Sequence, residues 1–369
     1  MERALELARL GAHSAHPNPM VGAVVVADGA IVGEGWHVAP GTPHAEVVAL
    51  RNAAERARGA TLYVTLEPCA HTGRTPPCID AIAEAGVSAV RYAIADPDPS
   101  VAGGGAKLLA ESGVDVSGGM LASEATELNA AYLIHRVQGR PRITYKAAMT
   151  IDGRTAAVDG SSKWISGPES REMVQQLRAE ADAIMVGSGT ILADDPSLNC
   201  RLKGFAGTPP VRVIVDSAGR LPAGARAADE SAPTWVLTSS QGESALRSRF
   251  GDSLELIALS DGSGQLDLGE AMARLAQRGI VELLCEGGAS LAGALLDRDL
   301  LDRCIFFVAP AVAGGSAGSP LFGGNSASTI ADVTKMDFQS VARVGDDLMI
   351  VVDPRPGAGR GTDGETHRS

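Results

Sequence analysis

Three residues in the first quarter of the chain have the types and the spacing of a catalytic zinc site. His44 precedes two cysteines, Cys69 and Cys78, each of which directly follows a proline. One imidazole and two thiols suit a tetrahedral zinc ion whose fourth position stays open for water. Glu46 stands two residues after the histidine, the arrangement in which zinc deaminases use a glutamate as general acid and base. Together these residues predict the hydrolytic removal of an amino group.

The segment between the two cysteines is longer than in the common deaminase motif. Eight residues, AHTGRTPP, separate Cys69 from Cys78, whereas the common motif has two. The longer gap is the first indication of what the substrate is. A structural zinc site, or two buried cysteines without metal, is the alternative interpretation. The order of histidine, glutamate, proline and cysteines favours catalysis.

A second candidate site lies where a strand pattern ends in two glycines. The run CEGGASLAGALL predicts a strand, a Gly-Gly turn and a helix with Ser290 in its first turn. Backbone N–H groups at the start of such a helix suit phosphate or pyrophosphate. Turns of this kind also serve packing alone, and both interpretations stay open at this point. Residues 141–353 contain no GxGxxG motif, so an ordinary dinucleotide-binding fingerprint is absent there.

The elements that must position the first site alternate between strand and helix patterns. A helix over residues 2–13 precedes two β-rich runs, 21–28 and 30–36, which an Asp-Gly turn joins as a hairpin. Further strands are predicted over 60–68, 87–96 and 114–117, and helices over 44–59, 76–86, 105–112 and 120–137. This order predicts an α/β layered domain whose sheet is mostly parallel after an antiparallel start. The cysteines then lie at a strand end or helix start, where thiolate is favoured.

The second half has its own α/β alternation, which starts after a linker at Gln138 to Pro141. Strands are predicted over 142–149, 181–189, 211–216, 234–239, 254–259, 281–288, 303–310 and 349–353. Helices are predicted over 168–180, 267–278 and 289–297. We therefore expect two domains, residues 1–140 and 141–353, followed by a disordered polar tail over 354–369.

The composition narrows the possible functions. A net charge of −12 argues against a general affinity for nucleic acid. No apolar run approaches the ~18 residues that a membrane span needs. The amphipathic N-terminal helix lacks the apolar core of a signal peptide, so we expect a cytoplasmic protein. Five cysteines do not indicate a disulfide framework, and those outside the zinc site, Cys200, Cys285 and Cys304, are expected as reduced thiols.

Taken together, the motifs resemble the bifunctional riboflavin-biosynthesis deaminase/reductase family. In the first half the resemblance rests on PNPMVGAVVV, GWHVAPGTPHAE and TLEPCAHTGRTPPC. In the second half it rests on KAAMTIDGRT, WIS, ADDPSLNCR and CEGGASL. It covers nearly the whole chain, and the long cysteine gap is its most specific part.

This resemblance implies an N-terminal cytidine-deaminase-like three-layer α/β/α domain that holds zinc. It implies a C-terminal dihydrofolate-reductase-like α/β domain that uses NADPH. The first reaction would be hydrolytic deamination of 2,5-diamino-6-ribosylamino-4(3H)-pyrimidinone 5′-phosphate. The second would reduce the ribosyl group of 5-amino-6-(5-phosphoribosylamino)uracil to ribityl. The family also suggests a dimer or larger homo-oligomer, and neither nucleic acid nor membrane is an expected partner.

The resemblance also assigns roles to individual residues. In the first half, zinc is held by His44, Cys69 and Cys78, and the catalytic residue is Glu46. Substrate contacts are implied there for Asn18, His37, His71, Arg74, Asp96 and Asp98. In the second half, cofactor contacts are implied for Ala148, Trp164, Thr190, Asp194, Ser217, Gly288, Ala289, Ser290, Leu291, Ala292, Gly293 and Ala294. Substrate contacts are implied there for Lys146, Ser162, Arg178, Leu198, Arg201 and Glu286.

Some of these assignments agree with the chemistry of the residues. Arg178 and Arg201 suit a phosphate clamp, because a guanidinium matches phosphate oxygens bidentately. Asp152 lies near Lys146 in the motif and is expected to help orient the substrate, but the proton donor of the reduction stays unassigned. Asp98 departs from the family, which usually has Asn in its Asp-Pro-Asn-Pro loop. An acid accepts bonds from ribose hydroxyls but cannot donate as an amide does, so we expect this exchange to tune the site.

Two other functions stay open from the residues alone. The HAE and PC elements also permit a nucleic-acid-editing deaminase of the tRNA adenosine type with an accessory domain. The acidic charge, the long cysteine gap and the reductase-like half argue against that function. A regulatory or binding protein with one inactive half is the third possibility, and the presence of both motif sets gives it little support.

Overall fold

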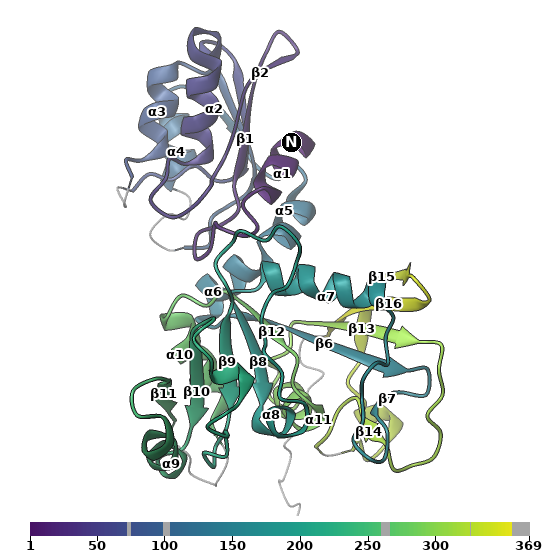
Figure 1. Ribbon diagram of the computed structural model, residues 1–369. Helices are drawn as coiled ribbons and strands as arrows, with labels where there is room; N and C mark the ends of the chain where they lie inside the picture. The colour runs from purple at the N-terminus through teal and green to yellow at the C-terminus, as the bar shows by residue number, and fades with distance from the viewer. Residues whose placement is uncertain (72–74, 99–103, 260–265, 325, 356–369) are drawn as a thin grey trace, which may run out of the picture. The chain divides into compact units, whose positions relative to one another are not determined.

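The chain folds as two compact units, which are described separately here (Figure 1). The computed structural model describes residues 1–71, 75–98, 104–259, 266–324 and 326–355. One unit comprises Met1–Pro141 with Ala276–Val281, and the other comprises Arg142–Leu275 with Glu282–Ser369. The expected tail from residue 356 onward and the candidate residue Arg74 lie outside the described residues.

The first unit is built on a five-stranded sheet of order β2-β1-β3-β4-β5. Its strands are β1 (Gly22–Ala27), β2 (Ala30–Trp36), β3 (Thr61–Leu66), β4 (Ala89–Ile94) and β5 (Asp115–Ser117). β1 pairs antiparallel with β2 and β3, whereas β3, β4 and β5 are parallel. The predicted antiparallel start and parallel continuation are therefore confirmed.

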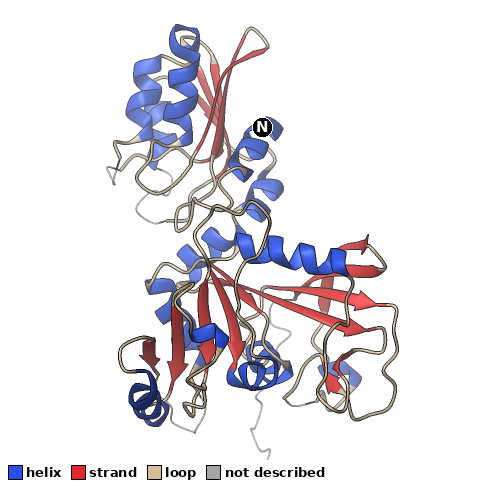
Figure 2. Ribbon diagram, viewed as in Figure 1, coloured by secondary structure: helices blue, strands red, loops and turns tan. Residues whose placement is uncertain are grey.

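Helices cover both faces of this sheet and make the predicted three-layer α/β/α arrangement (Figure 2). One face carries α2 (Ala45–Ala53), α3 (Cys78–Ala85) and α4 (Gly104–Glu111), which bury residues such as Ala49, Ile82 and Leu109. The other face carries α1 (Glu2–Arg9) and α5 (Ala122–Leu128), which contribute Leu7 and Ala125 to smaller clusters. Because α2 and α3 share one face, His44 and Cys78 at their starts come close together.

Two glycines on β2 allow α2 to approach the sheet closely. A Cβ atom at Gly33 would lie 2.2 Å from the carbonyl oxygen of Ala49, and one at Gly35 would lie 2.5 Å from that of Ala45. Any side chain there would push the helix, and His44 with it, away from the sheet. The predicted helix over 44–59 was too long, because α2 ends at Ala53 and a 3₁₀ turn follows over Ala54–Ala57.

The single helix predicted over 120–137 was also wrong, because the structure has two, α5 and α6 (Ala130–Gln138). They meet at Asn129, which is buried. Its side chain accepts a hydrogen bond from the Met20 N–H (2.8 Å) and donates one to the Met20 carbonyl (3.0 Å). A buried amide satisfied by one loop residue fixes both the helix break and the loop that carries Asn18.

The second unit is built on a nine-stranded sheet of order β11-β10-β9-β8-β12-β6-β13-β16-β15. The strands from β11 to β13 in this order are parallel, and β16 and β15 add antiparallel strands at one edge. The parallel strands are β6 (Arg142–Thr150), β8 (Ala183–Gly187), β9 (Val211–Val215), β10 (Thr234–Thr238), β11 (Glu255–Ala258), β12 (Glu282–Cys285) and β13 (Arg303–Ala309). The edge strands are β15 (Met336–Val344) and β16 (Asp347–Pro354).

The helices of this unit include the three that the sequence predicts. These are α7 (Pro168–Glu180), α10 (Leu268–Gln277) and α11 (Ala289–Leu296). The predictions omitted α8 (Ser188–Asp194) and α9 (Ser240–Phe250), and also the strands β7 (Arg154–Ala156), β14 (Ser319–Pro320) and β15. These elements are short, polar or at an edge, so they lack a clear apolar period. In the described residues, no helix has the length and apolarity to cross a bilayer.

Candidate active sites

The three predicted metal ligands converge in the first unit. The Nδ1 atom of His44 lies 2.9 Å from the Cys78 sulfur and 3.5 Å from the Cys69 sulfur, and the two sulfurs are 3.3 Å apart. All three ligand atoms fall within 4.8 Å of one another. One nitrogen and two sulfurs facing a common point match the ligands of a catalytic zinc site. The donor set therefore fits zinc.

Local structure explains why these ligands meet. Cys69 lies in the loop after β3, and Cys78 is the first residue of α3. The Cys78 backbone N–H at this helix start donates to the Cys69 sulfur at 3.3 Å. The hydrogen bond with the Cys78 thiol and that with His44 lower the pKa of Cys69, against the effect of burial. A helix start that stabilises thiolate is thus built into the site.

Thr75 is a functional residue that the sequence did not predict. Its Oγ1 atom lies 3.0 Å from Nε2 of His44, on the side of the ring opposite the two sulfurs. A partner on the second ring nitrogen fixes the orientation of a metal-binding histidine. The threonine stands in the long gap between the cysteines, so this gap was the signal that could have revealed it.

Glu46 lines the same cavity from the first turn of α2. Its side chain is buried, and burial raises the pKa of its carboxyl group while the charge of His44 opposes the change. A buried carboxylate with a raised pKa accepts a proton more readily than an exposed one. His44, Cys69 and Glu46 therefore line one pocket.

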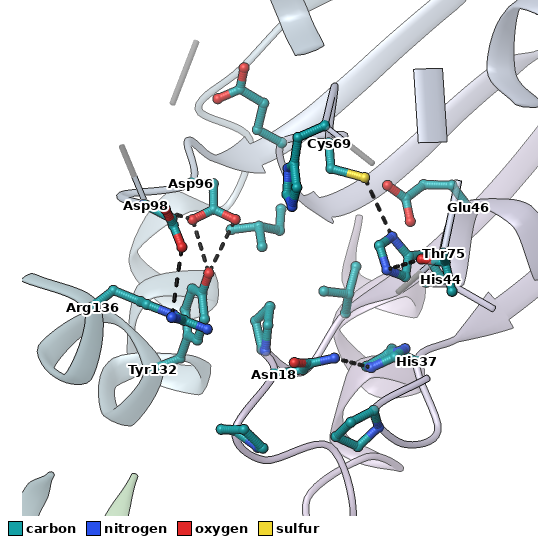
Figure 3. Close-up of a pocket in the computed structure, with 18 of the residues that line it drawn as sticks. Asn18, His37, His44, Glu46, Cys69, Thr75, Asp96, Asp98, Tyr132 and Arg136 are labelled. Atoms are coloured by element: carbon teal, nitrogen blue, oxygen red, sulfur yellow. Dashed lines mark hydrogen bonds and ion pairs between the residues drawn. The ribbon is translucent and has the colours of Figure 1, made fainter. Parts of the chain in front are cut away.

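The pocket has a volume of about 380 Å³ and extends well beyond the metal ligands. Near its floor, the Nδ2 atom of Asn18 lies 3.0 Å from Nε2 of His37 (Figure 3). Burial lowers the pKa of His37, which favours a neutral ring at pH 7. The pocket is lined by eight of the predicted residues: Asn18, His37, His44, Glu46, Cys69, His71, Asp96 and Asp98. Cys78 lies behind this lining.

Two further side chains from α6 contact the acids at the other end of this pocket. The Tyr132 hydroxyl donates to both carboxylate oxygens of Asp96, at 3.1 and 3.3 Å. Arg136 pairs with Asp98 at 3.8 Å, and Figure 3 shows this group on the side of the pocket opposite His44 and Glu46. Burial raises the pKa of Asp96, whereas its bonds to the Asp98 N–H and Tyr132 lower it. Sequence patterns did not single out either α6 residue.

A second, larger pocket of about 1080 Å³ lies in the second unit. It is formed where β8 and β12 end, beside the middle of their neighbour β6 at Tyr145 to Ala148. Its lining includes thirteen of the predicted residues: Lys146, Ala148, Ser162, Trp164, Arg178, Thr190, Asp194, Arg201, Glu286, Gly288, Ala289, Ser290 and Leu291. A cluster of this size from distant segments is consistent with a single site for cofactor and substrate.

Six predicted residues of this half lie outside the pocket lining, and their roles stay predictions. Leu198 packs in a hydrophobic cluster with Ile191, and Ala292 and Gly293 are buried on the inner side of α11. A Cβ atom at Gly293 would lie 2.2 Å from the Gly323 carbonyl oxygen, which explains the glycine by packing. Ser217 and Ala294 are half-buried. Asp152 accepts from Thr150 and two loop N–H groups, so it anchors a loop outside the pocket.

Three mostly buried charged side chains, Arg178, Glu286 and Lys146, interact with one another in this pocket. Arg178 donates to Glu286 through Nε (2.7 Å) and Nη2 (2.9 Å), and Lys146 lies 3.9 Å from the same carboxylate. Burial would raise the pKa of Glu286, but the charges of Arg178 and Lys146 hold it at about 2. Two cations against one anion leave this region net positive, which suits a phosphorylated ligand.

The pocket also has features that fit a dinucleotide. Gly288 caps α11 in an extended conformation, and a Cβ atom there would meet only Thr190, at 3.8 Å. The start of α11 therefore leaves room for a ligand beside its free N–H groups. Across the pocket, the exposed ring of Trp164 lies 4.7 Å from the Arg171 guanidinium, and Lys163 pairs with Asp194 at 3.6 Å. The residues present thus fit NADPH.

Comparisons with known proteins agree with this division. Residues 1–94 match the family model of the cytidine and deoxycytidylate deaminase zinc-binding region. Residues 141–350 match that of the RibD C-terminal domain. Because the second match is to a reductase domain, the nucleic-acid-editing alternative is not favoured.

Similar proteins cover nearly the whole chain. The riboflavin biosynthesis protein RibD of Escherichia coli is 41% identical, over 95% of this chain and 97% of its own length. That of Bacillus amyloliquefaciens is 40% identical, over 97% and 96%. The solved RibD structure from Acinetobacter baumannii has a TM-score of 0.87 and 37% identity, and covers 96% of this chain and 97% of its own.

A solved structure from Thermotoga maritima is described as a diaminohydroxyphosphoribosylaminopyrimidine deaminase/5-amino-6-(5-phosphoribosylamino)uracil reductase. It has a TM-score of 0.86 and 36% identity, and covers 96% of this chain and 97% of its own. The expected cytidine-deaminase-like and reductase folds and the two cofactors, zinc and NADPH, are confirmed. The chain belongs to the RibD family of bifunctional deaminase/reductases of riboflavin biosynthesis.

Proposed function

We propose that residues 1–140 carry the deamination and residues 141–353 the reduction, each through the residues described above. The observation that carries the first half is the convergence of His44, Cys69 and Cys78 within 4.8 Å in a pocket that also holds buried Glu46. Zinc, when bound, lowers the pKa of a coordinated water to about 7. Glu46 accepts one proton of the attacking water and delivers it to the ring nitrogen, and then carries the second proton, from the hydroxyl now on the ring carbon, to the amine that departs as ammonia.

The rest of the pocket binds and orients the phosphorylated pyrimidine. Asn18 and His37, held together at 3.0 Å, present an amide and a neutral imidazole to the pyrimidine ring and its sugar. Asp96 and Asp98 accept hydrogen bonds from ribose hydroxyls at the opposite end. His71, which is exposed at the pocket, approaches the sugar or its phosphate. Arg74, in the same cysteine gap of the sequence, is assigned the same role by its residue type alone.

In the reductase half, NADPH supplies a hydride when bound. Gly288 to Ala294 and Thr190 receive its phosphates, and Ala148, Trp164, Asp194 and Ser217 complete the cofactor contacts. Arg178 uses two of its five N–H donors on Glu286 and one on the Asn199 carbonyl, so two donors remain for the ligand. Together with Arg201, Lys146, Ser162 and Leu198, it holds the substrate and its phosphate.

A coupled assay tests the assignment. The purified, zinc-loaded protein receives the diaminopyrimidinone ribosylamino phosphate, and ammonia release and NADPH oxidation are followed separately. Ammonia release followed by NADPH oxidation is the expected result. Ammonia release without NADPH oxidation would contradict the reductase assignment, and no ammonia release would contradict the substrate of the first step.

The active form is proposed to be a homo-oligomer in the cytoplasm. The edge strand β15 exposes Phe338 and Val341, and Ile330 nearby in the chain is 86% exposed, so this edge offers apolar surface to a second copy. The five free thiols suit a reducing compartment. Analytical ultracentrifugation and cell fractionation check the two statements, and a monomer or a secreted protein would contradict them.

A further inference from the structure

The end of the deaminase pocket opposite the metal ligands carries an unusual balance of charge. Four acidic residues are among those that line this pocket, Glu46, Glu67, Asp96 and Asp98, although the Glu67 carboxylate accepts a hydrogen bond from the Ala106 N–H of α4. Among the described lining residues, Arg136 is the single arginine or lysine. Without this guanidinium, the described side chains at this end of the pocket would face a phosphorylated substrate with the charges of Asp96 and Asp98 and with no arginine or lysine.

Two of the four acids form a pair at this end. The Asp98 backbone N–H donates to Oδ1 of Asp96 at 3.0 Å, so the loop after β4 holds both side chains at the pocket wall. Their carboxylates suit the sugar hydroxyls of a ribosylated ligand. The same two charges repel a phosphate attached to that sugar, because unlike a hydroxyl it brings negative charge of its own.

Arg136 is placed to cancel this repulsion. Its Nη1 atom lies 3.8 Å from Oδ2 of Asp98, and its guanidinium lies 5.3 Å from the centre of the Tyr132 ring. Tyr132 in turn donates its hydroxyl to Asp96. One helix, α6, therefore contacts both acids, and Figure 3 marks the ion pair between Asp98 and Arg136 beside Tyr132. The two contacts restrict a long side chain that is 34% exposed.

We propose that Arg136 is a specificity-determining residue of the deaminase pocket: it offsets one of the two negative charges of the Asp96–Asp98 pair and so admits a phosphorylated ribosyl substrate. This inference rests on the proposed function, because it takes the phosphorylated pyrimidine as the substrate. A guanidinium has five N–H donors, so the pairing with Asp98 leaves donors for the ligand itself.

The test compares KM and kcat of deamination for the phosphorylated substrate and for the same riboside without its phosphate. R136M keeps an apolar stem on Tyr132 and removes the charge. It is expected to raise KM for the phosphorylated substrate about tenfold, with kcat within about twofold and KM for the riboside little changed. R136K, which keeps the charge, is expected to stay within about threefold of the wild type.

A second variant separates charge balance from a structural role. D98N/R136M removes one negative charge along with the positive one, so KM for the phosphorylated substrate should return to within about threefold of the wild type. R91M is the matched control, because Arg91 pairs with Asp115 on the same unit away from the pocket. Zinc content and circular dichroism report folding, and R136Q replaces R136M if the latter does not fold.

The outcomes distinguish this inference from the proposed function. No ammonia from the phosphorylated substrate with wild-type protein would mean that the proposed function itself fails. An active wild type with an unchanged KM in R136M, or with equal losses for both substrates, would overturn the role of Arg136 alone. A KM for the phosphorylated substrate that stays as high in D98N/R136M as in R136M would also overturn the role of Arg136.

Discussion

The deaminase pocket has a volume of about 380 Å³, whereas the reductase pocket has about 1080 Å³. The smaller pocket surrounds a buried glutamate and three ligand atoms within 4.8 Å of one another. The larger one is lined by many separate segments between Tyr145 and Gly323, and these include the ion pair of Arg178 with Glu286. They differ because in the first site protein side chains must handle protons, whereas in the second the cofactor brings the reactive hydride.

This difference explains where each site is sensitive. A site that moves protons depends on a few atoms at defined distances, so one side chain can decide its rate. A site that holds a large cofactor spreads its binding over many contacts, so each one contributes less. The effects of substitutions in the two pockets should therefore differ in kind as well as in size.

The largest effect is expected from Glu46→Gln. The three ligands stay in place, but the amide cannot take up the proton, so deamination should fall by about 10²- to 10⁴-fold. Zinc content and NADPH-dependent reduction of the deaminated intermediate should remain unchanged. Glu55→Gln, an exposed glutamate after the same helix, is the control. Full deamination by Glu46→Gln would remove the assigned role.

Thr75→Val tests whether the histidine needs its partner. Loss of the bond to Nε2 of His44 frees the ring, and zinc affinity should fall by about 10- to 100-fold. Competition with a chelator measures the affinity, and Thr61→Val on β3 serves as control. An unchanged affinity would mean that the two sulfurs and helix starts orient the ring without help.

Arg178→Ala tests the reductase pocket in the same way. Glu286 would lose its hydrogen-bonded partner and keep Lys146 at 3.9 Å and the charge of Arg201. The loss of a buried partner should lower the free energy of unfolding of that unit by about 3 kcal/mol. KM of the reduction should rise about tenfold or more, while deamination stays intact. Urea unfolding and both assays check this, with Arg343→Ala, an exposed pair with Asp346, as control. Equal loss of both activities would show that the halves depend on each other.

The smallest effect on KM of the reduction is expected from a change of pH between 5 and 8. Burial acts against ionisation of Glu286, but Arg178 and Lys146 hold its pKa at about 2, below the ordinary value of 4.5. A lowered carboxyl pKa stabilises the fold above pH 4.5, and this contribution is lost as pH falls from 4.5 towards 2. KM of the reductase substrate should therefore not follow a carboxyl titration between pH 5 and 8. A titration of KM with a midpoint in that range that Glu286→Gln abolishes would contradict this.

The chemistry of the first site could be predicted from the sequence because short-range order carries it. His44 and Glu46 are two residues apart, within one helical turn. Each cysteine directly follows a proline that ends an extended segment. Strong apolar periods also placed α7, α11 and the parallel strands nearly correctly. Edge and polar elements such as β15 and α9 were missed because they lack such a period.

What the sequence could not determine is which distant side chains share a pocket. The break at Asn129 depends on a bond to Met20, 109 residues away, and no local pattern reveals it. The contacts of Tyr132 and Arg136 with Asp96 and Asp98, and of Thr75 with His44, arise for the same reason.

The sequence by itself determined the reaction types, the metal ligands and the order of the two domains, since these follow from residue type and spacing along the chain. Only the tertiary structure decided the charge balance of each pocket and the partners of its acids. Electrostatic interactions depend on distance in space and on burial, and neither is encoded in spacing along the chain.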